Sequence, residues 1–308
     1  MSFNRRDLFG LGTGFVVCAS HPAWAEVTKR YHSDYFSFVG SDAEGSVYLA
    51  HDNNRGQTGD QFFADHWIMM YAEGTGIVPI VGSAHYPNLG RELLVIPDSE
   101  HFRFRGTIES GLHMSSATNG IELSVDRLVP VLRRQTEDRD YWIGAAPATM
   151  RWRGRTLKGR VLFEFIAQTG YNRFTSDFGA NWSNFNGLYL MTDDHQDLYI
   201  RYHERIQPGT PRESGMATFE GAGVLSAIRF SIKEMQALVD RDYRWPTRWE
   251  VGFTHAGGQW QLEASTVHLE AVADWTKGGF AMSVIEGEVR RSDGSGRRRL
   301  KGWAELLI

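Results

Sequence analysis

A tyrosine and a glutamate two residues apart are the side chains of this sequence best spaced for acid chemistry. Within residues 197–205, the even positions hold Leu198, Ile200, Tyr202 and Glu204. Alternate residues of a β-strand point to opposite faces, so a strand that buries its apolar positions also turns Tyr202 and Glu204 inward. Removing a carboxyl group from water favours its protonated form, which a general acid needs. The spacing therefore predicts Glu204 as a proton donor and Tyr202 as its orienting hydrogen-bond partner.

A second interpretation places Glu204 at the rim of a β-barrel. There the carboxylate would lie in water or pair with an arginine such as Arg205 or Arg248. The opposite face of the same strand carries Tyr199 and Arg201. The spacing alone leaves both interpretations of Glu204 open.

Tryptophans are frequent in the same half of the chain. Each one alone is typical of a core or rim aromatic. As a set they could line an apolar pocket, and their ring faces would stabilise a developing cation. Those that we expect to contact a ligand are Trp182, Trp249 and Trp260.

The sequence carries no short motif for metal, dinucleotide or covalent catalysis. Its ten histidines after residue 25 come no closer together than His195 and His203, so no metal-ligand spacing is present. No G-x-S-x-G element is found, and the single cysteine, Cys18, lies near the N-terminus. Residues 193–197 resemble a metal cluster, but their place between two strand-like segments favours a hairpin turn. We expect neither a cofactor nor a metal.

The charge balance argues against nucleic acid as a partner. The net charge is −4 and the pI is about 6.3, so no basic field is available to attract phosphates. No segment after the N-terminal region reaches 18 uninterrupted apolar residues, so we expect a soluble protein. The oligomeric state is left open.

The first 25 residues have the pattern of an export signal. Arg5 and Arg6 precede an apolar stretch that ends at Ala19, and Ala23-Trp24-Ala25 supplies a cleavage site. The paired arginines favour the twin-arginine pathway, whose substrates are exported already folded. We expect the twin-arginine export machinery to carry the protein to the periplasm or out of the cell. Residues 1–25 are then removed. The general secretory pathway and a buried N-terminal helix are the alternatives.

Short segments rich in β-branched and aromatic residues, separated by Gly, Asn and Asp, predict an all-β protein. Two segments, Lys233–Val239 and Arg127–Arg134, are predicted as short helices, the second weakened by Pro130. The predicted strands are Ser46–His51, Trp67–Tyr71, Leu93–Ile96, Ile121–Val125, Val161–Ile166, Leu188–Met191, Leu198–Tyr202, Ile228–Ile232 and Thr266–Val272.

An internal repeat indicates two related halves. Arg155-Thr156-Leu157-Lys158-Gly159 recurs as Arg298-Arg299-Leu300-Lys301-Gly302, each before a strand-like stretch. Chance recurrence in a basic, glycine-containing hairpin is the alternative. We place the join within Ile166–Asn181, which predicts one β domain at residues 26–175 and a second at 176–308.

Several short motifs, spread over most of the chain after residue 25, resemble those of one family. They are Ser33-Asp34-Tyr35-Phe36, a Trp/Phe-rich segment before Leu188–Thr192, the Asp193-Asp194 hairpin, the strand ending in Tyr202, Pro246-Thr247-Arg248-Trp249-Glu250, Glu286-Gly287-Glu288 and Gly302-Trp303-Ala304-Glu305-Leu306. With these motifs the sequence resembles the carotenoid 1,2-hydratases and the AttH-type secreted lipocalin-like proteins.

This resemblance implies two lipocalin-like domains, of barrel or sandwich form, with an apolar ligand pocket in or between them. It also implies that an acid two positions after a tyrosine, here Glu204 after Tyr202, protonates an isolated double bond. Water then attacks the tertiary cation. The family's D-H-x-W-G element falls at residues 175–179, where Ser176 replaces the histidine and Phe178 the tryptophan. We expect Asp177 to activate water and Ser176 and Phe178 to contact the ligand.

Three functions follow as hypotheses. The first is an exported hydratase or cyclase acting on an apolar, unsaturated, isoprenoid- or polyketide-like molecule. The second is a non-enzymatic carrier of an apolar ligand in the periplasm, favoured by the missing histidine. The third is a secreted carbohydrate-active protein, in which Glu286 and Glu288 are alternate residues of one predicted strand and share a face with Val284.

Overall fold

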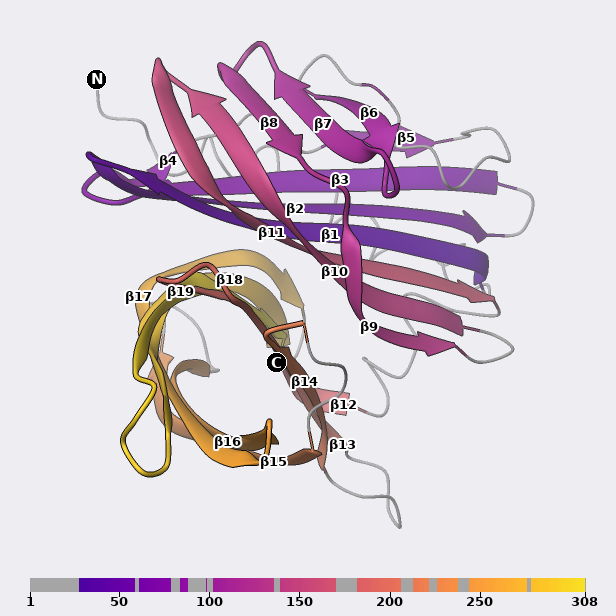
Figure 1. The fold of residues 1–308 in the computed structure, drawn as a ribbon. Coiled ribbons are helices and arrows are strands. Elements are labelled where there is room, and N and C mark those ends of the chain that lie inside the picture. The colour runs from indigo at the N-terminus through magenta and orange to yellow at the C-terminus, as the bar shows by residue number, and fades with distance from the viewer. Residues whose placement is uncertain are drawn as a thin grey trace.

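The computed structural model is made of β-strands throughout the part of the chain that it describes (Figure 1). The described residues are 28–58, 61–78, 84–87, 98, 102–135, 139–169, 182–205, 213–221, 226–237, 244–275 and 278–307. Over these ranges no helix is long and apolar enough to cross a membrane. The strands form two antiparallel sheets, one from each half of the chain, and each sheet curls as in a lipocalin-like domain. The predicted all-β, two-domain fold class is confirmed.

The N-terminal domain, residues 28–169, contains one eleven-stranded sheet. Its order is β4-β3-β2-β1-β11-β10-β8-β7-β6, while β5 pairs with β3 and β9 pairs with β10. The long strands form one layer of the domain, and β6, β7 and β8 fold over one face of that layer (Figure 1). The strands are β1 (Thr28–Asp42), β2 (Gly45–Thr58), β3 (Gln61–Ala72), β4 (Gly76–Val78), β5 (Ala84–Pro87), β6 (Arg103–Thr107), β7 (Gly111–Ser116), β8 (Ile121–Val125), β9 (Val129–Gln135), β10 (Arg139–Trp152) and β11 (Arg155–Thr169).

The C-terminal domain, residues 182–307, contains one eight-stranded sheet in the order β14-β13-β12-β19-β18-β17-β16-β15. Figure 1 shows this sheet almost end-on, curled around its own apolar interior. The strands are β12 (Trp182–Thr192), β13 (Asp197–Arg205), β14 (Glu213–Phe219), β15 (Ser226–Ala237), β16 (Arg244–His255), β17 (Gly258–Trp275), β18 (Gly278–Arg291) and β19 (Arg298–Leu307).

Both predicted helices are wrong. Most of Lys233–Val239 lies in β15, where Ile228, Phe230 and Ile232 alternate with polar residues and the edge strand pairs with β16. The period of two and this long-range pairing override the helix-forming residues near the strand's end. Most of Arg127–Arg134 lies in β9, which pairs only with β10. An edge strand tolerates Pro130 because one side of it needs no backbone donor.

The repeated segments occupy equivalent places in the two domains. The first begins β11, which pairs with β1 and β10, and the second begins β19, which pairs with β12 and β18. A Cβ on Gly159 would lie 1.9 Å from the carbonyl oxygen of Val39, and one on Gly302 would lie 1.9 Å from that of Tyr189. In both domains the last strand thus needs glycine at a point where it pairs closely with the first. The equivalence supports two related halves. The predicted join itself falls partly in 170–181, outside the described residues.

An apolar core joins the two domains. Tyr35, Tyr48 and Leu162 of the N-terminal sheet pack with Met282 and Trp303 of the C-terminal sheet, all at most 4% exposed. The N-terminal sheet is therefore buried on both faces, one against its own domain's core and one against the other domain.

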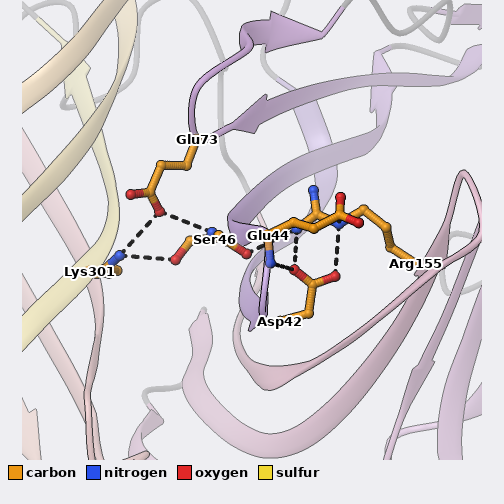
Figure 2. Close-up of polar contacts among 7 residues, drawn as sticks. Asp42, Glu44, Ser46, Glu73, Arg155 and Lys301 are labelled. Atoms are coloured by element: carbon orange, nitrogen blue, oxygen red, sulfur yellow. Dashed lines mark hydrogen bonds and ion pairs between the residues drawn. The ribbon is translucent and has the colours of Figure 1, made fainter.

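Polar contacts fix the edges of this interface. The Arg160 guanidinium donates two hydrogen bonds, of 2.9 and 2.5 Å, to the Asp197 carboxylate of the other domain. Figure 2 shows a second contact, where Lys301 of β19 donates to Ser46 at 3.0 Å and lies 3.5 Å from the Glu73 carboxylate. Contacts of these kinds hold the two sheets in a fixed relative position.

Candidate active site between the domains

Strand β13 supplies side chains to two different environments. As predicted, Leu198 and Ile200 point into the C-terminal core. The opposite face carries Tyr199, fully buried, and Arg201, 8% exposed, which lie against the N-terminal sheet. A guanidinium group buried at a domain interface needs a compensating partner.

That partner is Glu164 of β11, in the other domain. Arg201 Nη1 donates to Glu164 Oε1 at 2.8 Å, and both side chains are more than 90% buried. The Tyr189 hydroxyl donates a short hydrogen bond to Glu164 Oε2, and the Tyr199 hydroxyl lies 3.4 Å from the same oxygen. The Tyr189 oxygen also lies 3.2 Å from Oε2 of Glu305. We name Glu164, Tyr189, Tyr199, Arg201 and Glu305 the interdomain cluster.

Glu305 is the acid of this cluster whose protonated form is favoured. Burial of its carboxyl group, together with the charges of Glu164 and Asp52, raises its pKa well above the usual value of 4.5. Its hydrogen bonding agrees, because Tyr189 has a single hydroxyl proton and directs it at Glu164. The remaining contact, between the Tyr189 oxygen and Glu305 Oε2, then needs a proton on the Glu305 carboxyl group. Burial also raises the pKa of Tyr189 far above 10, so this phenol remains a donor.

Tyr35 adds a polar group beside the cluster. Its ring lies 4.5 Å from that of Tyr189, and its buried hydroxyl has no hydrogen-bond partner within the described part of the chain. Burial raises the pKa of Tyr35 well above 10, and the charges of Glu305, Asp52 and Glu164 raise it further.

Aromatic rings form the wall around these polar groups. Trp67 lies 5.5 Å from Phe280 of the other domain and 6.3 Å from Tyr35. Its indole nitrogen donates to Asp52 at 3.2 Å. Asp52 and Glu305 are half-buried, at the seam between the domains. The arrangement combines a neutral acid, a second carboxyl group and aromatic faces, which suits proton donation to an apolar molecule.

No family model and no curated protein sequence matches the chain. The chain does match several solved structures. Kievitone hydratase from Nectria haematococca is 11% identical, with a TM-score of 0.58, and the match covers 93% of this chain and 92% of that one. CghA with Sch210972 is 9% identical, with a TM-score of 0.55 and coverage of 91% and 88%. The putative AttH protein NE1406 from Nitrosomonas europaea is 11% identical, with a TM-score of 0.55 and coverage of 90% and 92%. The chain shares their fold.

Tyr202 of the predicted site lies on the face of β13 opposite to Tyr199 and Arg201. Tyr202 is 5% exposed and stacks on Phe230 at 4.1 Å, inside the curled sheet. Glu204 lies near the end of β13, opposite Ser183 and Glu213 in the register, and its side chain lies outside the described part. The role of Glu204 stays a prediction.

Two of the predicted ligand-binding tryptophans, Trp249 and Trp260, belong to the apolar core of the C-terminal domain. Trp249 is fully buried and its indole nitrogen donates to Asn186 at 2.9 Å. The Trp260 ring lies 5.2 Å from the Phe219 ring. The side chain of Trp182 lies outside the described residues, as do residues 176–178 with Ser176, Asp177 and Phe178.

The carbohydrate hypothesis relied on Glu286 and Glu288. Val284, which shares their face, packs in the interdomain core, so this face of β18 looks away from the C-terminal interior. Glu286 accepts from the Tyr48 hydroxyl at 3.0 Å, and Glu288 pairs with Arg290 at 2.6 Å. Both carboxylates thus serve contacts within or between the domains.

Sequence reasoning missed the interdomain cluster although one signal was present. Glu164 stands in the run Val161-Leu162-Phe163-Glu164-Phe165-Ile166. A carboxylate in the middle of an otherwise apolar strand is costly unless it is paired, which marks it as a buried polar site. The identity of its partners, in another domain, could not be read from the same run.

Proposed function

We propose that this protein is a hydratase- or cyclase-like enzyme that protonates a double bond of an apolar, unsaturated small molecule held between its domains. The observation that carries the proposal is the buried carboxyl group of Glu305, with a raised pKa, hydrogen-bonded to Tyr189 beside the Glu164–Arg201 ion pair. Two proteins with this fold support the proposal. One is a hydratase by name, kievitone hydratase, and the other, CghA, is described with the small molecule Sch210972.

The proposed step conserves atoms and charge. The Glu305 hydroxyl transfers its proton to one carbon of a C=C bond, and the other carbon becomes a tertiary carbocation. Water then adds its oxygen to the cation and loses a proton to Glu305 or Asp52, which gives an alcohol. In a cyclisation, a second C=C bond attacks the cation in place of water, and a later loss of a proton restores the acid.

The walls of the site suit the cation. The ring faces of Trp67, Tyr35 and Phe280 lie around the polar groups and carry negative electrostatic potential. An apolar isoprenoid- or polyketide-like skeleton would replace water against these rings. Arg201 is neutralised by Glu164, so it adds no net positive charge that would oppose the cation.

Glu204, with Tyr202, remains the alternative acid, and Asp177 the alternative base. Tyr202 is buried in the C-terminal interior, so a substrate protonated by Glu204 would have to enter the curled sheet rather than the seam. The two assignments therefore predict different binding places, and the variants Glu305→Gln and Glu204→Gln separate them.

A carrier without catalysis is the second candidate. It is favoured by Ser176 and Phe178, which stand where the resembling family has a proton-handling histidine and a cation-stabilising tryptophan. A carrier would use the same aromatic seam to hold an apolar molecule and release it unchanged.

We further propose that the protein acts after export to the periplasm or beyond, with residues 1–25 removed. The support is the pair Arg5-Arg6 before an apolar stretch and a small-residue cleavage site.

The experiment that separates enzyme from carrier begins with the protein purified from its own host. Solvent extraction and mass spectrometry identify co-purifying molecules, which are then incubated with fresh protein. We expect an apolar unsaturated compound that gains the mass of water or isomerises to a cyclic product. A compound that binds saturably and returns unchanged would establish the carrier instead.

A further inference from the structure

The C-terminal sheet carries a pocket of about 440 Å³ where strands β15, β16 and β17 lie side by side. This volume is in the range of ligand sites in proteins. None of the residues of the interdomain cluster belongs to its walls. The walls are formed by Glu234 and Gln236 of β15, Thr247 and Arg248 of β16, and Ser265, Thr266, Val267, His268 and Leu269 of β17.

Five consecutive residues of β17 line this pocket, from 265 to 269. Alternate side chains of a strand point to opposite faces, so a pocket on one face would contact only every second residue. An unbroken run of five shows that the pocket lies along the edge of the strand, where backbone N–H and C=O groups point. The pocket therefore faces main chain as well as side chains.

The pairing between β16 and β17 ends at this place. Their register closes with Arg248 opposite Ser265, and within the described residues the two strands pair no further, although β17 continues to Trp275. Two positions on, the same register would bring Pro246 opposite Val267, and proline has no N–H to donate to a sheet. The two strands thus form a fork beyond Ser265.

Each strand of the fork carries a β-bulge. Thr247 of β16 has no residue opposite it in β15, and Val267 of β17 has none in β18. A bulge bends its strand, ends regular pairing and is frequent next to functional sites. Val267 is also 50% exposed, which is unusual for a large apolar side chain of this protein. We name the space between these two bulges the strand fork.

The charged side chains at the strand fork already have partners. Arg248 Nη1 donates to Glu234 Oε1 at 3.0 Å, and His268 Nε2 lies 3.5 Å from Glu270 Oε2. A ligand there needs no net charge to balance. The other polar side chains of the walls are neutral hydroxyl and amide groups, from Gln236, Thr247, Ser265 and Thr266.

We propose that the strand fork binds an extended, uncharged peptide segment, which adds as a short strand to the edge of β17 beyond Ser265. A strand paired on one side only leaves every second N–H and C=O free, and a peptide main chain satisfies both kinds at once. The exposed Val267 side chain offers an apolar contact to one side chain of the peptide. This site is separate from Glu305 and does not depend on the proposed function.

The test uses the whole chain and three probes: acetyl-Thr-Val-Thr-Val-amide, acetyl-Thr-Pro-Thr-Pro-amide and cellotetraose. The proline peptide keeps the carbonyl groups and lacks two N–H donors, and cellotetraose offers hydroxyl groups in place of amides. Hydrogen–deuterium exchange is followed by mass spectrometry. At about ten times its dissociation constant, the first peptide should slow exchange within residues 265–269 about tenfold. The other two probes should leave it unchanged.

The variant Ser265→Tyr fills the strand fork from β17. Ser265 is exposed and tyrosine favours strands, so the melting temperature should stay unchanged while the peptide response is lost. Gln236→Tyr fills the fork from the exposed wall of β15 and should have the same effect. Gln261→Tyr is the matched control, because Gln261 lies on the same face of β17 as Ser265, opposite Gly252 and outside the pocket. It should keep the full response.

Three results would overturn the proposal. One is unchanged exchange within residues 265–269 in the presence of the first peptide, or slowing only in the sheet's edge strands β14 and β15. Another is equal slowing by the proline peptide or by cellotetraose, since main-chain donors would then not be recognised. The third is a full response in Ser265→Tyr or Gln236→Tyr, or its loss in Gln261→Tyr.

Discussion

The hydroxyl of Tyr189 joins two carboxyl groups from different domains, Glu164 by a short hydrogen bond and Glu305 at 3.2 Å. Because the phenol has one proton, only one of these carboxyl groups can receive it. The ion pair with Arg201 keeps Glu164 as the acceptor, and Glu305 must supply its own proton. The protonated form of Glu305 is therefore favoured at the seam between the domains.

The raised pKa of Glu305 predicts how stability depends on pH. Below about pH 4.5 the carboxyl group is protonated in both folded and unfolded chains. As the pH rises, the unfolded chain releases this proton first, so the free energy of unfolding falls until the folded pKa is passed. Glu305→Gln removes this loss. Urea denaturation should find the variant more stable than the wild type at pH 8, with the difference shrinking toward pH 4.5.

Asp42→Asn is the control of opposite sign. Its hydrogen bond with Arg155, drawn in Figure 2, lowers the pKa of Asp42. Asp42 therefore stabilises the fold at neutral pH, and that contribution is lost as the pH falls. The variant should be less stable than the wild type at pH 7 and approach it in acid. A Glu305→Gln difference that grows toward acid would contradict the neutral-acid assignment.

The ion pair Glu164–Arg201 should behave as a buried pair. Glu164→Gln leaves the guanidinium without a counter-charge, so we expect a loss of about 3–5 kcal/mol in the free energy of unfolding. The double variant Glu164→Gln/Arg201→Met should regain much of it. Asp98→Asn, at an exposed pair with Arg105, should change stability little. If Glu164→Gln unfolds at the same urea concentration as the wild type, the buried pair is not formed in solution.

Two glycines should be equally intolerant of a methyl group. Gly159→Ala and Gly302→Ala each push a Cβ to 1.9 Å from a backbone oxygen of the first strand of the domain. We expect each to cost about 1–3 kcal/mol or more, because two paired strands must move apart. Gly252→Ala, whose nearest atoms lie at 3.9 Å, should be tolerated. Thermal unfolding compares the three, and a harmless Gly302→Ala would contradict the close approach of β19 to β12.

Export should depend on the paired arginines. Replacing Arg5 and Arg6 by lysine should leave folded, full-length precursor inside the cell, since the twin-arginine pathway reads that pair. Fractionation and mass spectrometry of the N-terminus measure the effect. Normal export of the lysine variant would point to the general secretory pathway.

Local patterns predicted much of the fold. Alternation located β2, β8 and β13, and it correctly turned Leu198 and Ile200 into the C-terminal core. The turn at residues 193–196 was also correct, and His195 adopts a positive φ of 62° there. Such features depend on residues close in sequence, so one strand or hairpin is enough to reveal them.

The site was harder to predict because it depends on contacts between domains. Arg201 and Tyr199 have the sequence pattern of a solvent-facing strand surface, yet the N-terminal sheet covers them. Glu164 and Glu305 are 141 residues apart in the chain and meet through Tyr189. A pattern within one strand cannot reveal which sheet packs on its other face.

The most direct test of the account is deuterium transfer to carbon. Wild type, Glu305→Gln and Glu204→Gln are incubated in D₂O with the unsaturated molecule extracted from the host, and the product is analysed by mass spectrometry. We predict that the wild type and Glu204→Gln place deuterium on the protonated carbon, while Glu305→Gln does so about 10²–10⁴-fold more slowly. Incorporation by Glu305→Gln at the wild-type rate would contradict the assignment of Glu305 as the acid.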